Sequence, residues 1–244
     1  VPAKKKAPKD FLKNNITINN RNSAMNVLKK TLIAIAAIVV LYGALSCINI
    51  MQKGPSEYQG QTMTEILGVP AEKATPADLE KLSKAQLMQL FYAAKAPDME
   101  ALNGEYKAKT LPVGILSSSA EFYTHHFFGP GRWEGKAFTV KDNENGHGYN
   151  IFKSTGNDGK DALARTRRMN TSIGKSPIDG KESYILDYSP YNGGTVHSMQ
   201  DEIRKINDTL FLGMGYMGLG GGSINPAPFI IYGEAAPWIG PDEK

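Results

Sequence analysis

Cysteine and histidine are scarce in this chain, which has one cysteine and four histidines among 244 residues. A single cysteine excludes an intrachain disulfide and a cysteine-based zinc cluster. The histidines are not spaced as metal ligands, and the adjacent pair His125 and His126 lies in an aromatic segment that is typical of amphipathic packing. Hydrophobic residues make up 41% and charged residues 21%, which excludes collagen-like, largely disordered and polytopic membrane chains.

Motifs for catalysis and cofactor binding are lacking as well. The sequence has no P-loop and no G-x-S-x-G, and nothing indicates a Ser/His/Asp arrangement. A G-x-G-x-x-G occurs over residues 213–218, but the SINPAP that follows it cannot begin the helix that a dinucleotide site needs. These glycines instead predict tight strand bending, and the apolar stretch 213–222 predicts a contact surface or a barrel mouth. We therefore expect no cofactor and no metal, and the sequence gives an enzymatic function no support.

Charge is distributed unevenly along the chain. Residues 1–30 carry a net charge of +7, whereas the rest of the chain carries −3. The arm over residues 1–30 is polar and low in apolar side chains, so we expect it to be disordered without a partner. Its Lys4–Lys6 cluster indicates attraction to anionic lipid headgroups rather than to nucleic acid, because no nucleic-acid-binding motif accompanies it.

One long uncharged run stands out, from Thr31 to Gln52. As a helix its 22 residues would extend roughly 33 Å, enough to cross the hydrocarbon core of a bilayer. The basic residues before the run favour a cytoplasmic N-terminus. The sequence thus predicts a single-pass signal-anchor in the inner membrane, with everything after residue 52 in the periplasm or its extracytoplasmic equivalent.

A second interpretation of the same region is a lipoprotein signal peptide. Met25 would be its start, and Ala44 to Cys47 (ALSC) would form a lipobox that directs lipidation of Cys47. Leucine is usual where Ala44 stands, so we favour the intact anchor. Both interpretations place the folded domain outside, on a membrane surface.

Short helices are predicted between the membrane segment and residue 101. Capping signals occur at Thr62, at Thr75 and at Ser83, the last opening a helix to about Lys95. Leu87, Leu90, Phe91 and Ala94 recur at helical spacing on this last helix. We expect this apolar stripe to pack against the domain that follows.

From Leu102 onward the periodicity is that of β-strands, and turn-rich pieces separate most of the runs. One helix is expected near 117–128. Eight strands without intervening helices favour an antiparallel barrel or sandwich over a parallel sheet. We predict a mainly β fold with an antiparallel eight-stranded barrel-like domain over 102–244. The predicted strands are 104–111, 132–141, 148–154, 162–173, 183–188, 196–206, 209–216 and 229–234.

The second predicted strand opens with Gly131 to Gly135, GRWEG, which is a G-x-W-x-G motif. In this the sequence resembles the lipocalin-like (calycin-type) barrels, in which such a motif opens a strand and its tryptophan closes one end of the barrel. The resemblance implies a shared barrel style, with Trp133 at one end of the interior.

Candidate ligand-binding residues follow from strand alternation. Arg165 and Arg167 share one face of the fourth predicted strand, and an inward pair would hold a carboxylate or phosphate headgroup. Tyr184 and Tyr188 share a face of the fifth. The other interpretation is that both arginines lie on the solvated face or pair with Asp187. The predicted ligand-binding set is Arg165, Arg167, Tyr184, Tyr188 and Trp133.

Two functions fit these features. The first is a membrane-anchored accessory or structural subunit of a larger membrane protein complex, with other membrane-protein subunits as partners. The alternative is a lipocalin-like carrier or sensor of a lipid or other amphiphile. An interior cavity of ~300 Å³ or more would favour the carrier, and a barrel filled by its own side chains would favour the subunit.

Overall fold

The computed structural model describes residues 9–155 and 161–242. The chain divides into two compact units, with the boundary between Leu45 and Ser46. A long helix, α1 (Lys9–Met51), makes up the first unit and runs into the second. The second unit contains the short helices and the strands.

Helix α1 contains an apolar segment that is long enough to cross a membrane. This segment covers Met25–Met51 and includes a window with a mean hydropathy of 2.5. Its large apolar side chains are exposed, including Ile33 at 69%, Ile38 at 66% and Val40 at 71%. By length and composition the segment is suited to serve as a membrane anchor or as a signal sequence.

Short helices precede the barrel, as the capping signals predicted. They are α2 (Met63–Leu67), η1 (Ala71–Lys73), α3 (Pro76–Glu80), α4 (Lys84–Ala93) and η2 (Met99–Ala101). Capping boxes begin α2, α3 and α4 at Thr62, Thr75 and Ser83. Each box satisfies backbone N–H groups at a helix start that would otherwise lack partners.

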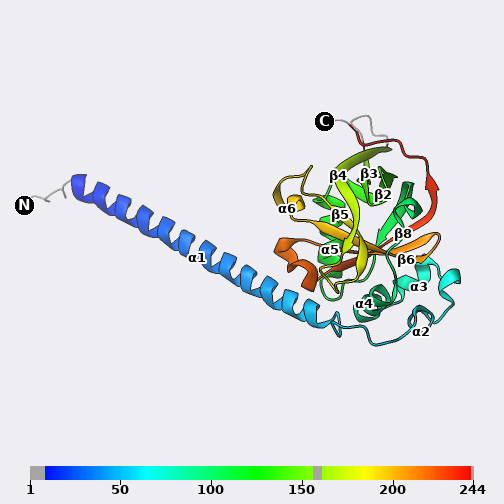
Figure 1. Cartoon of the computed structure of the whole chain (residues 1–244). Helices are drawn as coiled ribbons and strands as arrows, with labels where there is room; N and C mark the ends of the chain where they lie inside the picture. The colour runs from blue at the N-terminus through cyan, green and yellow to red at the C-terminus, as the bar shows by residue number, and fades with distance from the viewer. Residues whose placement is uncertain (1–8, 156–160, 243–244) are drawn as a thin grey trace, which may run out of the picture. The chain divides into compact units, whose positions relative to one another are not determined.

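Eight strands form a closed antiparallel barrel in which each strand pairs with the next and the first pairs with the last. This confirms the predicted fold class and fits a lipocalin-like barrel in general. Figure 1 shows the strands together in the second unit. Helix α5 (Ser117–His126) follows β1, α6 (Gly194–His197) follows β5, and η3 (Gly218–Gly220) and η4 (Gly222–Ile224) follow β7. The strands are β1 (Gly104–Thr110), β2 (Arg132–Val140), β3 (Asn145–Thr155), β4 (Asp161–Lys175), β5 (Glu182–Asp187), β6 (Gln200–Asn207), β7 (Leu210–Tyr216) and β8 (Ala227–Ala236).

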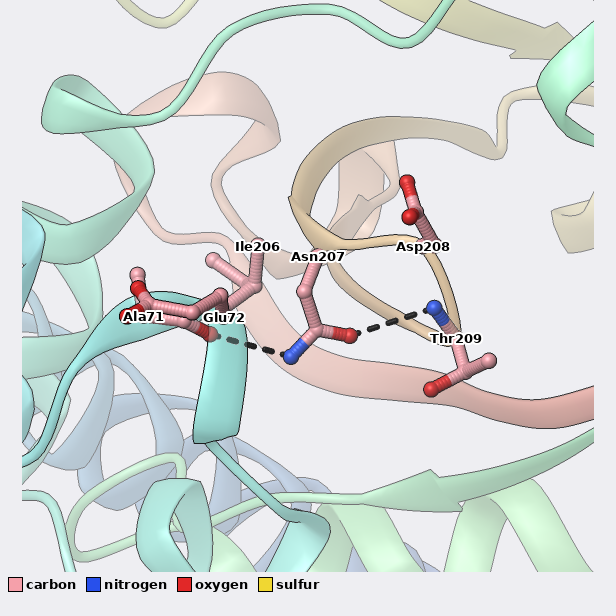
Figure 2. A pocket seen from close by; sticks show the side chains of 6 residues that line it. All are labelled: Ala71, Glu72, Ile206, Asn207, Asp208 and Thr209. Carbon is pink, nitrogen blue, oxygen red and sulfur yellow. Dashed lines mark hydrogen bonds between the residues drawn. The ribbon is translucent and has the colours of Figure 1, made fainter.

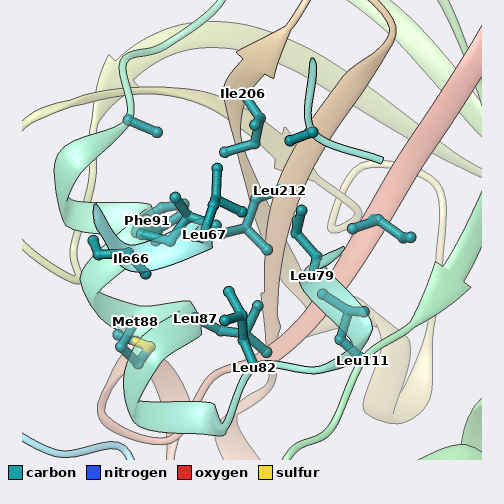
Figure 3. Packing of buried hydrophobic residues seen from close by; sticks show 14 of the residues in the cluster. Ile66, Leu67, Leu79, Leu82, Leu87, Met88, Phe91, Leu111, Ile206 and Leu212 are labelled. Atoms are coloured by element: carbon teal, nitrogen blue, oxygen red, sulfur yellow. The ribbon is translucent and has the colours of Figure 1, made fainter. Parts of the chain in front are cut away.

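Two apolar layers hold the second unit together, one inside the barrel and one outside it. Outside, the apolar faces of the short helices cover β6, β7 and β8, and Leu87 and Phe91 of α4 pack with Leu212 of β7 (Figure 3). Phe211, the neighbour of Leu212, belongs to the interior cluster instead. Because both faces of β7 are buried, its sequence is a continuous apolar run rather than an alternating one.

Candidate functional site

A polar cluster lies inside the barrel, surrounded by apolar side chains. We call it the core polar cluster, and its members are Trp133 and Lys136 of β2, Asn150 of β3, Tyr188 just after β5, and Asp201 of β6. Each member is at most 5% exposed. Burying polar groups is costly unless they bond to one another, and five of them do so here, so the cluster is the strongest candidate for a built site.

The Lys136 ammonium lies at the centre of the cluster and contacts three oxygens. Its Nζ is 2.6 Å from Oδ2 of Asp201, 2.5 Å from the hydroxyl of Tyr188 and 2.9 Å from Oδ1 of Asn150. The Tyr188 hydroxyl donates to the same Asp201 oxygen at 2.8 Å. All three protons of the ammonium group therefore have acceptors, and the ion pair lies in a medium of low dielectric constant.

The Asn150 side-chain amide is bonded on both its oxygen and its nitrogen. Nε1 of Trp133 donates to Oδ1 at 3.0 Å, so this oxygen accepts from Trp133 as well as from Lys136. Nδ2 donates to the Tyr188 hydroxyl at 3.1 Å and to the carbonyl oxygen of Arg167 at 3.2 Å. Two donors on the carbonyl oxygen draw electron density away from the amide carbon.

Aromatic rings enclose the ammonium group. Lys136 Nζ is 5.5 Å from the ring centre of Trp133 and 5.2 Å from those of Tyr188 and Phe229. Phe128 and Phe152 pack edge to face nearby, and Phe128 also contacts the Tyr188 ring. The rings exclude water and add cation–π attraction to the ion pair.

Burial sets the protonation behaviour of the cluster. It lowers the pKa of Lys136, and the attraction of Asp201 offsets part of that effect. Burial also raises the pKa of Tyr188 well above its usual value, and the neighbouring Asp201 charge adds to the increase. The neutral amine of Lys136 is thus closer in free energy to its ammonium form than it would be in water.

A bulge in β2 brings Trp133 and Lys136 to the same face. These residues are three apart, so strict alternation would place them on opposite faces of the strand. The register with β3 shifts between Trp133 and Gly135, and Lys136 then pairs directly with Asn150. A bulge inserts one residue and reverses the alternation beyond it. Sequence reasoning missed Lys136 because strict alternation does not foresee this bulge, for which Gly135 is the signal. It missed Asn150 and Asp201 because they lie on β3 and β6 and reach Lys136 only in the closed barrel.

The structure separates the predicted ligand-binding residues. Trp133, Tyr184 and Tyr188 lie in the barrel interior. Tyr184 is not part of the core polar cluster, since its hydroxyl donates to Oγ1 of Thr171 at 3.1 Å. Arg165 pairs with Glu105 on the outer face, where its Nε lies 2.6 Å from Oε1.

A second bulge, in β4, explains why the two arginines diverge. Arg167 has a φ of 56°, a left-handed conformation, at the place where the register between β3 and β4 shifts. Arg165 pairs with Ile151, a member of an outer apolar cluster, whereas Met169 beyond the bulge lies in the interior. Arg167 Nε donates to the carbonyl oxygen of Phe128 at 2.5 Å. The arginines therefore do not form an inward pair.

An open pocket of about 370 Å³ lies on the outside of the barrel, between η1 and the turn from β6 to β7 (Figure 2). It is lined by Ala71, Glu72 and residues 206–209. Asn207 Nδ2 donates to the carbonyl oxygen of Ala71 at 3.0 Å, and its Oδ1 accepts from the Thr209 N–H at 3.1 Å. The amide is thus used to join η1 to the turn.

Cys47, His125 and His126 are not members of the core polar cluster. Cys47 is a free, exposed thiol in α1. His125 Nδ1 accepts from the Trp133 N–H at 3.2 Å, and the His126 ring packs on Phe122. Among residues 9–155 and 161–242, no three His, Cys, Asp or Glu side chains gather as metal ligands would.

Comparisons with known proteins identify no family for this chain. No protein-family model matches the chain, and no curated protein sequence is significantly similar to it. One solved structure, a crystal structure of a protein from Thermomonospora curvata, is 16% identical with a TM-score of 0.45. The match covers 65% of this chain and 92% of the other.

Proposed function

We propose that this protein is a single-pass, membrane-anchored accessory subunit of a larger membrane protein complex, with its barrel on the extracytoplasmic side. The observation that carries the proposal is an exposed apolar helix, Met25–Met51, followed by a barrel whose interior holds a large cluster of its own buried side chains. The basic residues before the helix support a cytoplasmic N-terminus. The domain has the features of a scaffold fixed to a membrane.

The last turn of α1 is built into the second unit by polar bonds. Asn49 is 3% exposed, and its Nδ2 donates to Oδ1 of Asn225 at 2.8 Å. Lys84 Nζ donates to the same oxygen at 2.8 Å and to the Asn49 carbonyl oxygen at 3.3 Å, where it satisfies a helix-end acceptor. Burial, with a contribution from the Lys53 charge, lowers the pKa of Lys84 to about 8. These bonds support a domain that begins where the helix would leave the membrane.

Several exposed apolar side chains lie in the segment that hydrogen-bonds to the residues at the end of α1. The Ile115 N–H donates to Oε1 of Gln52 at 2.6 Å, and the Ile115 side chain is 50% exposed. Phe122 in α5 is 57% exposed, and Phe127 just after α5 is 63% exposed. Single exposed apolar residues are ordinary, but several in one segment indicate a contact surface. We assign this segment, residues 115–127, to contact with the partner subunit.

The carrier alternative needs a lined space inside the barrel. Tyr184, Leu186, Ile203 and Phe211 are fully buried members of the interior cluster, and the core polar cluster occupies the polar part of the same interior. Side chains that pack against one another in this way occupy space that a drug-sized amphiphile would need. This filling favours the subunit over the carrier.

The test is assembly of the full chain in its own host membrane. After extraction in mild detergent, the wild-type protein should migrate on a native gel in a species much larger than 26.6 kDa. The double variant Ile115→Ser, Phe122→Ser should shift it toward the free chain, because it removes apolar contact area. The matched control is Leu163→Ser, an exposed apolar side chain on β4.

The same extraction decides against the proposal if the wild-type chain migrates alone. If that free chain retains one lipid molecule per chain, identified by mass spectrometry, the result would support the carrier instead.

A further inference from the structure

We propose that Lys136 and Asn150 join through an amide bond that cross-links β2 to β3 inside the barrel, formed by the chain itself. Nζ of Lys136 bonds to Cγ of Asn150, the Cγ–Nδ2 bond breaks, and ammonia leaves. The inference is independent of the proposed function, because it depends only on the core polar cluster.

Proximity is the first argument. Lys136 and Asn150 are direct cross-strand partners in the β2–β3 ladder. Nζ of Lys136 already lies 2.9 Å from the amide oxygen whose carbon it would attack. Groups held this close by a rigid sheet react far faster than the same groups free in solution, because no entropy is lost in bringing them together.

Activation of the amide is the second argument. Trp133 Nε1 donates to Oδ1 of Asn150 at 3.0 Å, on the atom that gains negative charge during attack. A fixed donor in a dry site stabilises that charge, as an oxyanion hole does. The same bond also satisfies the buried indole N–H, so one contact serves both the fold and the proposed reaction.

A complete proton path is the third argument. Asp201 Oδ2, 2.6 Å from Nζ, accepts one proton from the ammonium and so frees the attacking electron pair. Tyr188 contacts Lys136 Nζ, Asp201 Oδ2 and Asn150 Nδ2, so it can relay a second proton from the attacking nitrogen to the leaving nitrogen. The ammonium, the carboxylate and the amide thus become a new amide, a neutral carboxylic acid and ammonia, with atoms and charge balanced.

Burial favours the product. Before reaction the barrel holds an ammonium that is 1% exposed and a carboxylate that is 4% exposed. Reaction removes both charges, and with them the desolvation penalty that a buried ion pair carries. The surrounding rings of Trp133, Tyr188 and Phe229 exclude the water that would hydrolyse an activated amide.

The intact mass of the purified full chain tests the proposal directly. The denatured protein should weigh about 17 Da less than its sequence mass, the loss of one ammonia. Trypsin should then release one species in which the peptides 133–141 and 142–153 are joined through Lys136 and Asn150, and Lys136 itself should resist cleavage. Fragmentation of that species locates the bond.

Two conservative variants test the proposed roles. Tyr188→Phe keeps the ring but removes the relay, and Asp201→Asn keeps the shape but removes the base, so both should accumulate uncross-linked chain. Tyr184→Phe is the matched control, a buried barrel tyrosine whose hydroxyl contacts Thr171 and not the cluster. This control should cross-link as completely as the wild type.

Three results would overturn the proposal. The first is a wild-type chain of unmodified mass whose peptides separate at Lys136. The second is a loss of about 18 Da, one water, with the bond mapped to Asp201 instead of Asn150. The third is equal cross-linking in folded Asp201→Asn and wild type. The wild-type measurement stands even if a variant fails to fold.

Discussion

At the scale of single residues, Gly135 lies in the bulge that determines which β2 side chains face the barrel interior. Its place in the bulge of β2 allows Trp133 and Lys136 to face inward together. A side chain at this position has no room, because a Cβ there would overlap the backbone carbonyl oxygen of Tyr106 on β1. The second glycine of the G-x-W-x-G sequence is therefore required by packing. The Tyr106 backbone cannot move away from an added methyl group as the end of a flexible side chain can.

Replacing this glycine gives a prediction with an internal control. Gly135→Ala should destabilise the barrel by about 3 kcal/mol or more, because β1 and β2 must separate to fit the methyl group. Gly174→Ala in β4 adds the same methyl group, but its Cβ would lie an ordinary 3.5 Å from Cγ1 of Ile185. Urea unfolding of both variants in the same detergent measures the difference, and equal stability would contradict the account.

At the scale of elements, a buried ion pair fixes α4 against the outside of the barrel. Arg204 of β6 is fully buried, and its guanidinium donates to both carboxylate oxygens of Asp179 at 2.7 Å. It also donates to the Phe91 carbonyl oxygen near the end of α4 at 2.8 Å and lies over the Phe91 ring. Arg204 thus adds buried polar bonds to an apolar contact, beside the bond that Lys181 Nζ donates to the Tyr92 carbonyl oxygen of the same helix at 2.7 Å.

Removing one partner of this pair should be costly. Asp179→Ala leaves the Arg204 charge buried and unpaired, and we expect a loss of about 3–5 kcal/mol in the free energy of unfolding. Asp208→Ala breaks the exposed Lys205–Asp208 pair, in which Asp208 is 93% exposed, and should change stability by less than about 1 kcal/mol. Thermal unfolding of the two variants distinguishes these cases, and a small effect in both would show that Asp179 does not hold α4 in place.

At the scale of the whole molecule, the two units differ in how much of their apolar surface they expose to solvent. The barrel unit buries most of its apolar side chains between its own layers. Helix α1 exposes its apolar side chains over Met25–Met51, which is unfavourable in water and favourable in a bilayer. The feature that favours a membrane environment therefore lies in α1.

Charges placed in the middle of this helix should release the protein from the membrane. Ile38→Lys combined with Val39→Lys should weaken insertion by about 2.5–3.5 kcal/mol for each lysine. The exposed segment after the helix provides the control, since Ser56→Lys should leave insertion unchanged. Alkaline carbonate extraction of membranes measures the retained fraction. Full retention of the double variant would mean that α1 is not the anchor.

Strand positions and the starts of the short helices could be predicted from sequence because they depend on local chemistry. Capping residues such as Thr62 and Ser83 act within one turn of helix, and the strand alternation is interrupted by recognisable turns. Each of the eight strands of the closed barrel overlaps a predicted one. The largest shift is at β6, where residues 194–197 form α6 before the strand begins at Gln200. The arm was predicted wrongly, since residues 9–30, expected to be disordered, are helical in α1.

The barrel interior could not be predicted in the same way, because each bulge reverses the faces of the residues beyond it. In β4 the bulge at Arg167 places Arg165 on the outer face with Glu105, although alternation groups it with the inward Met169. Nothing in the sequence marks Arg167 for a left-handed conformation. A one-residue error in register changes the whole list of interior residues.

Local sequence thus specified an apolar helix and an antiparallel barrel, since composition and periodicity act over a few residues at a time. Only the closed barrel brought Lys136, Asn150 and Asp201 into contact, from strands β2, β3 and β6. Residues separated by up to 65 positions meet there because of strand register, curvature and closure, which belong to the folded sheet as a whole.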